Sequence, residues 1–228
     1  GTRDRHPKVS LHVPAYAEPH EVVIATQDAL ARLRYPNFEV LVIDNNTEDP
    51  GLWRPVETHS RRLGERFRFF HVAPLPGAKA GALNFALRQT APDAELVGVV
   101  DSDYQAEPDF LERLVGYFDD PKMGFVQTPH DYRGWQDSLY QRMCYWEYRR
   151  FFETTMVSFN EWDAAITVGT MCVIRRKALE EAGGWAEWCL TEDSELAVRI
   201  HALGYSGVYL TTTFGRGLIP ETFEGYKR

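Results

Sequence analysis

The chain has 228 residues, of which 44% are hydrophobic and 25% are charged, and its formal net charge is -8. This length and composition suffice for one globular α/β domain with its own core. The acidic balance disfavours a nucleic-acid-binding protein, because surfaces that bind phosphate backbones are normally basic. A polyphosphate ligand would need local positive charge, which a divalent cation supplies.

The cysteine pattern and the hydropathy exclude two further classes. Cys144, Cys172 and Cys189 are odd in number and lack C-x-x-C spacing. They predict neither a disulfide framework nor a zinc site, and a reducing cytosolic setting fits best. No secretory signal is visible, and the most apolar stretch, Ala164–Ile174, is shorter than the roughly 20 residues of a membrane-spanning helix. The abrupt ends of the chain indicate a domain excised from a longer protein.

Short β-rich runs alternate with helical patterns through the first half of the chain, which favours βαβ units and a mostly parallel sheet. Strands are predicted at 9–13, 38–44, 67–72 and 96–101, with helices between them at 21–34, 52–63 and 79–90. The second half is less regular, with helices predicted at 108–118, 136–156 and 194–202 and a strand at 124–128. The helix at 136–156 is apolar on most sides, so it is either core or covered by membrane-proximal segments.

Carboxylates follow two of the predicted strands, at the edge where open α/β sheets bind ligands. Asp44 ends one strand, Asp101 ends another, and Asp103 follows two positions later. Positions i and i+2 of an extended chain point to the same side. Asp101 and Asp103 are therefore expected to converge on Mg²⁺ or Mn²⁺, which can also bridge a diphosphate. The alternative is a plain turn, since Asp and Ser favour turns.

Two further motifs stand at predicted helix starts. Thr191 is expected to cap the helix at 194–202, and Glu192 and Asp193 suit the positive end of its dipole. The dipole also favours the ionised form of Asp193, which in a cleft can accept the proton of a sugar hydroxyl. Lys79 opens the helix at 79–90 among small residues, an arrangement that suits either phosphate binding or plain solvation.

Taken together, these motifs resemble glycosyltransferase family 2, specifically its processive β-glucan synthase branch, which includes cellulose-synthase-like proteins. The matching segments are Pro14-Ala15-Tyr16-Ala17-Glu18, Asp44-Asn45-Asn46-Thr47, Ala78-Lys79-Ala80-Gly81-Ala82-Leu83-Asn84, Asp101-Ser102-Asp103, Val168-Gly169-Thr170, Thr191-Glu192-Asp193 and Arg199-Ile200-His201-Ala202-Leu203-Gly204-Tyr205. Within the branch, segments 44–47, 143–152 and 183–189 look most like bacterial β-(1,3)-glucan and cyclic-glucan synthases.

The resemblance implies a single GT-A catalytic domain over 1–228, with a mostly parallel central sheet flanked by helices. A Rossmann-like nucleotide-sugar-binding half would span about 8–104 and an acceptor-binding half about 105–228. The implied reaction is an inverting transfer of glucose from UDP-glucose to a growing β-glucan, with β-(1,3) linkage expected and Mg²⁺ or Mn²⁺ as cofactor. Transmembrane helices just after this segment, and a place at the cytoplasmic face of the bacterial inner membrane, are also implied.

The resemblance also assigns residues to roles. Asp193 would be the catalytic base, and Asp101 and Asp103 would hold the metal. The nucleotide-sugar donor would contact Pro14, Ala15, Tyr16, Glu18, Asp44, Lys79 and Asp101. The glucan acceptor would contact Gly169, Thr170, Trp185 and Glu192. Trp185 and Trp188 could stack on glucose rings, and core packing is the alternative for both.

Two departures from the family pattern stand out. Asn45 replaces the second Asp that is common in the family, which puts a contact from this position to the nucleobase of the donor in doubt. The Q-x-x-R-W motif, which contributes to the acceptor and diphosphate site, is absent, although segment 220–228 resembles what normally precedes it.

Four other functions stay open on sequence alone. They are a catalytically silent nucleotide-sugar-binding module, a synthase of another β-linked polysaccharide such as cellulose, a sugar-nucleotide pyrophosphorylase and a glycoside hydrolase. A pyrophosphorylase would need a Gly-rich loop where this chain has residues 14–18. A hydrolase would need two acids flanking one glycosidic bond.

Overall fold

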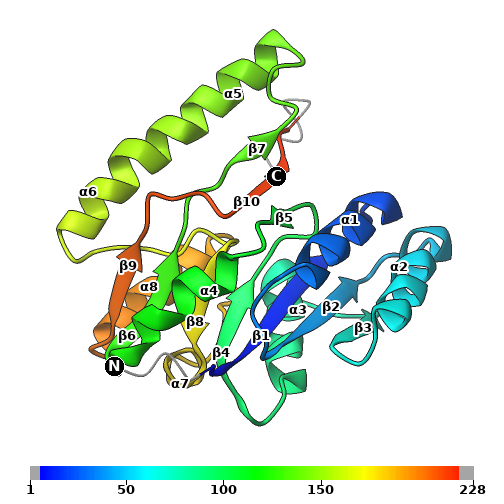
Figure 1. Ribbon diagram of the computed structural model, residues 1–228, viewed down its shortest axis with the longest axis horizontal. Coiled ribbons are helices and arrows are strands. Elements are labelled where there is room, and N and C mark those ends of the chain that lie inside the picture. The colour runs from blue at the N-terminus through cyan, green and yellow to red at the C-terminus, as the bar shows by residue number, and fades with distance from the viewer. Residues whose placement is uncertain (1–5, 221–228) are drawn as a thin grey trace.

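A computed structural model describes residues 6–220 of the chain. Its strands form a seven-stranded sheet and a separate three-stranded sheet (Figure 1). In order across the large sheet, the strands are β3 (Phe67–Val72), β2 (Phe38–Asn45), β1 (Lys8–Ala15), β4 (Ala94–Val99), β8 (Cys172–Arg175), β6 (Met123–Gln127) and β9 (Ser206–Tyr209). The small sheet consists of β5 (Gln105–Ala106), β10 (Gly215–Leu218) and β7 (Tyr132–Arg133).

Helices cover the sheet and join its strands. They are α1 (His20–Ala31), α2 (Pro50–Leu63), α3 (Ala78–Gln89), α4 (Phe110–Leu114), the 3₁₀ helix η1 (Val115–Asp119), α5 (Leu139–Arg150), the π-helical turn η2 (Phe151–Thr155), α6 (Met156–Glu161), α7 (Arg176–Glu181) and α8 (Glu192–Ala202).

The first half of the chain folds as the alternating pattern predicted. Strand β1 pairs in parallel with β2 and with β4, and β2 pairs in parallel with β3. Helices α1, α2 and α3 connect these strands, so the prediction of a mostly parallel sheet flanked by helices is confirmed. The second half contains β8, a strand that the sequence pattern did not predict. It runs antiparallel to both β4 and β6, which explains why the regular βαβ alternation stops there.

Several element ends differ from the prediction because tertiary contacts override local pattern. Helix α1 ends at Ala31 rather than at residue 34. The following residues pack as loop instead: Leu33 and Tyr35 are buried, and the Tyr35 hydroxyl donates to the Pro7 carbonyl at 2.6 Å. The helix predicted at 108–118 is split into α4 and η1, and α8 begins two residues earlier than predicted, at Glu192.

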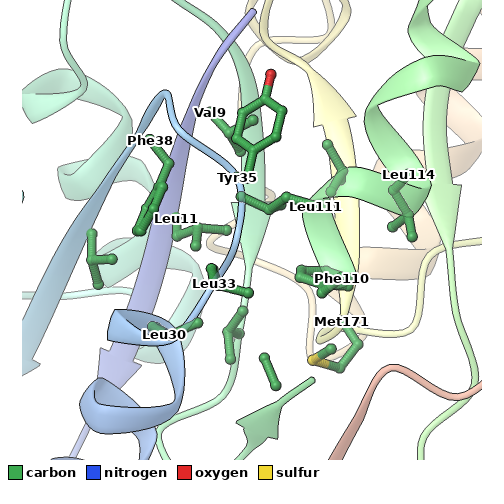
Figure 2. Packing of buried hydrophobic residues seen from close by; sticks show 14 of the residues in the cluster. Val9, Leu11, Leu30, Leu33, Tyr35, Phe38, Phe110, Leu111, Leu114 and Met171 are labelled. Carbon is green, nitrogen blue, oxygen red and sulfur yellow. The ribbon is translucent and has the colours of Figure 1, made fainter. Parts of the chain in front are cut away.

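The main core lies between the parallel strands and the helices on one face of the sheet. Val9 and Leu11 of β1 lie opposite Leu30 of α1 and Phe110 and Leu111 of α4, and all five are buried (Figure 2). Burying each such side chain stabilises the folded state by about 1.5–3 kcal/mol. This core fixes β1 against β4, the two strands whose carboxyl ends carry several of the predicted site residues.

Helices α5 and α6, with η2 between them, form one long arm at the top of Figure 1. Its inward face buries Cys144, Tyr145 and Met156. Leu139, Met143 and Trp146 lie on the opposite side and are exposed, although they are large and apolar. The prediction that this helix is part of the core is therefore correct for one of its faces and wrong for the other. No helix within residues 6–220 is both long enough and apolar enough to span a membrane.

Gly81 allows α3 to pass close to the loop that precedes it. A Cβ added at Gly81 would lie 1.9 Å from the carbonyl oxygen of Pro76. We expect Gly81→Ala to push this loop away and to lower the free energy of unfolding by about 2 kcal/mol, measured by calorimetry. Gly116→Ala is the matched control, since a Cβ there meets nothing within 4 Å. Equal melting temperatures for the two variants would contradict the close approach.

Candidate active site

The two carboxylates after β4 are held in the loop by fixed partners. Asp101 Oδ1 accepts a hydrogen bond from Lys79 Nζ at 2.5 Å, and the Asp101 N–H donates to Thr170 Oγ1 at 2.8 Å. Asp103 Oδ2 accepts from the N–H of Leu218, in β10, at 2.8 Å. The loop therefore joins the end of β4 to α3, to the segment before β8 and to the small sheet.

Lys79 lies in the first turn of α3 and reaches across the site. Besides its ion pair with Asp101, Nζ donates to the carbonyl oxygen of Gly169 at 3.0 Å. Burial alone would lower the pKa of Lys79, but the Asp101 carboxylate more than offsets this, so the pKa lies above its ordinary value. Lys79 is thus a fixed positive charge at the carboxyl edge of the sheet.

Gly169 brings the predicted base next to this lysine. It has a φ of +86°, and an added Cβ would lie 2.9 Å from Asp193 Oδ2 and 3.3 Å from Lys79 Nζ. A side chain here would be strained and would separate the two charged groups. The structure therefore places Asp101, Lys79, Gly169 and Asp193, which come from four separate sequence motifs, in one site.

Asp193 is fixed in the first turn of α8. Its Oδ1 accepts from the Ser194 N–H at 2.6 Å, and its carbonyl oxygen accepts from Thr167 Oγ1 at 2.7 Å. Thr191 occupies the N-cap position, but its side chain makes no capping hydrogen bond, so that prediction is wrong. Burial raises the pKa of Asp193 above its ordinary value, although the Ser194 N–H and Lys79 lower it in part. The helix-dipole argument predicted the opposite direction.

Further acids lie near the ion pair of Lys79 and Asp101. Burial raises the pKa of Glu18, and the carboxylates of Asp103 and Asp101 raise it further. Burial also raises the pKa of Asp103, to which Asp101 adds. Glu192 is nearly buried, and its pKa is raised mainly by burial. Lys79 alone does not neutralise so many carboxylates, so this part of the site favours an added cation.

The donor atoms at this position fit Mg²⁺ or Mn²⁺, both of which prefer oxygen ligands. Asp101 and Asp103 provide carboxylate oxygens, and their mutual repulsion is the strain that a bound cation would relieve. Within residues 6–220, no cluster of three or more His, Cys, Asp or Glu side chains is arranged to hold a metal ion. A Mg²⁺ ion held by these two carboxylates would keep several water ligands, as is usual for this ion.

The raised pKa of Glu18 predicts a stability effect. Its carboxyl group keeps a proton to higher pH in the folded than in the unfolded state, so the contribution of Glu18 to the free energy of unfolding falls as pH rises above about 4.5, the ordinary pKa. We expect Glu18→Gln, without added metal, to raise the melting temperature at pH 7.5 by about 1–3 °C and to leave it unchanged at pH 4. Glu21→Gln, at an exposed position in α1, is the control. A gain that persists at pH 4 would exclude ionisation as its cause.

The ends of β2 and β3 form a second polar cluster. Asp44 Oδ1 bonds His71 Nδ1 at 2.8 Å, and Asp44 Oδ2 accepts from Thr47 Oγ1 at 2.6 Å. Thr47 Oγ1 in turn accepts from the Ala17 N–H at 2.8 Å. The His71 ring stacks on Trp53 with centroids 4.3 Å apart and planes 11° from parallel. Sequence reasoning selected Asp44 but missed His71, although His71 also lies near the end of a predicted strand.

The segment after β1 contributes fewer exposed side chains than predicted. Pro14 and Ala15 are buried within the strand, so they shape the site rather than present a surface to a ligand. Tyr16 is 63% exposed and Glu18 is half-buried. Asn45, which departs from the family pattern, donates from Nδ2 to the Ala78 carbonyl oxygen at 3.1 Å and so holds the start of α3.

Two of the predicted acceptor contacts are corrected by burial. Trp185 is only 3% exposed and its ring lies in the core beside His12, so it offers no face to a sugar. Thr170 is completely buried, and its hydroxyl is used by the Asp101 N–H. Trp188, by contrast, is 81% exposed. Core packing is thus the correct interpretation for Trp185 and not for Trp188.

Two amides that the sequence analysis did not select hold the site together. Asn84 of α3 donates to the Trp185 carbonyl at 2.9 Å and to Glu187 Oε1 at 2.8 Å, and its Oδ1 accepts from the Trp185 N–H. Gln127, at the end of β6, accepts from the Val168 N–H at 2.9 Å and donates to the Thr170 carbonyl at 2.8 Å. The sequence did contain a signal for Asn84, because this residue is the last one of the K-A-G-x-L-N segment.

The fold matches solved glycosyltransferases. Mannosyltransferase PcManGT from Pyrobaculum calidifontis, in complex with GDP-Man and Mn²⁺, has a TM-score of 0.75 at 24% identity, over 96% of this chain and 59% of that chain. S. aureus TarS 1-349 in complex with UDP-GlcNAc has a TM-score of 0.68 at 17% identity, over 97% of this chain and 61% of that chain. The protein therefore has the GT-A fold, as the resemblance implied.

The family follows from the sequence comparison. The model described as "Glycosyltransferase like family 2" matches residues 6–228, and the chain belongs to this glycosyltransferase family. Glucomannan 4-beta-mannosyltransferase 1 of Cyamopsis tetragonoloba is 29% identical over 98% of this chain and 44% of its own length. Cellulose synthase 1 of Komagataeibacter xylinus is 28% identical over 96% of this chain and 14% of its own length. The chain thus spans less than half of either relative.

Proposed function

We propose that this chain is the catalytic domain of an inverting, metal-dependent β-glucan synthase that uses UDP-glucose. The observation that supports it best is the meeting of Lys79, Asp101, Gly169 and Asp193 at the carboxyl edge of the sheet. A positive charge, a carboxylate and a candidate base side by side suit a reaction in which a diphosphate departs and a hydroxyl attacks. In this proposal residues about 8–104 bind the donor and about 105–228 the acceptor.

Asp193 is the proposed catalytic base. It takes the proton of an acceptor hydroxyl as that oxygen attacks the anomeric carbon from the face opposite the nucleotide. The new glycosidic C–O bond forms while the bond from the anomeric carbon to the diphosphate oxygen breaks, which inverts an α-linked donor to a β-linkage. The raised pKa of Asp193 makes its carboxylate a stronger base than an ordinary aspartate. No covalent sugar–enzyme intermediate is needed.

The donor is proposed to lie along the carboxyl ends of β1, β2 and β4. Tyr16 and Asp44 are proposed to flank the nucleoside end, and Glu18 lies close enough to Asp103 and Asp101 for their charges to raise its pKa. Asp101 and Asp103 would hold Mg²⁺ or Mn²⁺, which neutralises negative charge on a departing diphosphate. Lys79 adds a second positive charge on the same side, held there by α3.

The acceptor side is proposed to include Gly169 and Glu192, which border Asp193. We further propose that the complete protein carries transmembrane helices after this segment and works at the cytoplasmic face of the bacterial inner membrane. Resemblance to membrane-bound glucan synthases supports this part of the proposal.

Donor and linkage are tested on the full-length protein in membranes. Release of nucleoside diphosphate is measured with UDP-glucose, UDP-GlcNAc and GDP-mannose, and the product is digested with β-(1,3)- and β-(1,4)-specific glucanases. UDP release from UDP-glucose with a product cleaved only by the β-(1,3) enzyme is expected. A β-(1,4) product would instead support the alternative that the similarity to cellulose synthase favours, a cellulose-like synthase. Nucleotide binding without turnover would indicate a silent binding module.

A further inference from the structure

Helices α1 and α2 pack against each other (Figure 1), and a surface pocket lies between them. Its volume is about 700 Å³, within the range of small-ligand sites. Helix α1 contributes His20 and Ile24 to the lining, and α2 contributes the rest, including Arg54, Thr58 and Arg62. None of the lining residues belongs to the donor, metal or acceptor sites described above.

The pocket carries positive charge although the chain as a whole is acidic. The chain has 33 Asp and Glu residues and a net charge of -8, yet no Asp or Glu lines this pocket. Arg54 and Arg62 line it, and within residues 6–220 neither forms an ion pair with an acid. The acids near it in sequence are paired with other basic residues. These pairs are His20–Glu21 at 3.1 Å, Asp28–His59 at 2.7 Å and Glu57–Arg61 at 2.6 Å.

The two arginines lie on one face of α2. Residues four apart in a helix are neighbours on its surface, so Arg54, Thr58 and Arg62 form a row along the pocket. At 1.5 Å per residue, Arg54 and Arg62 are about 12 Å apart along the helix axis. This spacing suits a ligand with one anionic group near each arginine and a neutral part beside Thr58.

The junction between the two helices is fixed by side-chain hydrogen bonds. His59 Nε2 bonds Asp28 Oδ1 at 2.7 Å, and Gln27 Nε2 donates to Ser60 Oγ in the buried layer beneath the pocket. The pocket is therefore formed before a ligand arrives, and binding does not have to separate α1 from α2.

The surface around the pocket favours a soluble ligand over the phosphates of a lipid bilayer. A helix that binds a membrane surface inserts large apolar side chains between the lipids. In the part of the chain that the structure describes, none of the exposed large hydrophobic side chains belongs to α1 or α2.

We propose that this pocket binds a small soluble molecule with two separate phosphate groups, one at Arg54 and the other at Arg62. The guanidinium group suits this role because its forked donors match the oxygens of a phosphate. The part of the ligand between the phosphates lies beside Thr58 and Ile24. No step of the proposed transfer reaction uses this pocket, so the inference stands without the proposed function.

The test titrates fructose 1,6-bisphosphate and adenosine 3′,5′-bisphosphate into the 228-residue chain in EDTA and follows binding by calorimetry. Fructose 6-phosphate and adenosine 5′-monophosphate are the references with one phosphate. We expect at least one bisphosphate to bind about tenfold or more tightly than its reference, because a second charged hydrogen bond adds at least this much. Arg54→Gln and Arg62→Gln should each remove the gain, and Thr58→Glu should abolish binding by placing a negative charge between the arginines.

Arg32→Gln is the matched control, since it removes an exposed positive charge at the end of α1 outside the pocket and should leave the affinity unchanged. Equal affinity for bisphosphate and reference overturns the inference, as does a gain that survives in both arginine variants. Absence of binding by either bisphosphate overturns it too. So does a chain that sediments with phosphatidylglycerol vesicles but binds no soluble bisphosphate.

Titration of UDP with Mn²⁺ on the same samples reports on the donor site separately. The wild type and all four variants should bind UDP with equal affinity. Loss of bisphosphate binding with UDP binding kept therefore assigns the effect to the pocket. A wild-type chain that binds no UDP would contradict the proposed function instead, while the bisphosphate titrations still report on the pocket.

Discussion

Replacing Asp193 by asparagine is expected to lower glycosyl transfer by about 10³-fold and to leave UDP binding nearly unchanged. Asparagine keeps the size of the side chain and an oxygen that can accept from the Ser194 N–H. In the proposed mechanism, the substitution removes only the capacity to take a proton from the acceptor hydroxyl. The measurement is the rate of UDP release by the full-length protein at saturating donor, together with UDP titration of the 228-residue chain.

Glu195→Gln serves as the control for this experiment. Glu195 lies on the same helix, α8, but its carboxylate pairs with Arg199, so transfer should remain close to wild type. As pH is lowered, the transfer rate of the wild type should begin to fall at a higher pH than it would with a base of ordinary aspartate pKa, because the pKa of Asp193 is raised. An Asp193→Asn enzyme with more than a tenth of wild-type activity would exclude Asp193 as the base.

Replacing Asp103 by alanine is expected to weaken Mn²⁺-dependent UDP binding at least 100-fold. Loss of groups that merely orient metal ligands already costs about 10–100-fold, and Asp103 is proposed as a direct ligand. The measurement is calorimetric titration of UDP into the chain with Mn²⁺ and again with EDTA. The wild type should bind UDP tightly only with Mn²⁺, and the variant should bind weakly in both.

Asp93→Ala is the matched control for charge, since Asp93 is exposed and pairs with Lys8. Its UDP affinity should match that of the wild type. Tight wild-type binding of UDP in EDTA would contradict the metal proposal and would leave Lys79 as the main partner of the diphosphate.

Local sequence pattern predicted the first half of the fold because each of its elements carries its own periodicity. Strands β2 and β4 are mostly apolar runs, and the acids at their ends, Asp44 and Asp101, stand out from the neighbouring sequence. Strand β8 was missed because it has only four residues and lies inside a longer apolar stretch. Its place in the sheet depends on antiparallel pairing with β4 and β6, and sequence spacing carries no signal for such distant partners.

The site was predicted in part for the same reason. Asp101, Lys79 and Asp193 each lie beside a recognisable element end, and the structure brings all three together. The burial of each side chain could not be predicted from the sequence. Trp185 and Trp188 are the same residue type three positions apart, and only tertiary packing makes one ring buried and the other exposed. The direction of the Asp193 pKa also depends on how much protein surrounds the carboxylate, which the local dipole argument ignored.

The hydrogen bonds of Asn84 have a mechanical consequence. Asn84 belongs to the same helix as Lys79. Its side-chain amide hydrogen-bonds the backbone of Trp185 and the side chain of Glu187, which precede Asp193 in the sequence. Three hydrogen bonds therefore tie the helix that carries Lys79 to the segment that leads to Asp193. The distance between the Lys79 charge and the proposed base, Asp193, is thus set by the protein itself before any substrate arrives, and preorganised geometry of this kind avoids the cost of rearranging groups during a reaction.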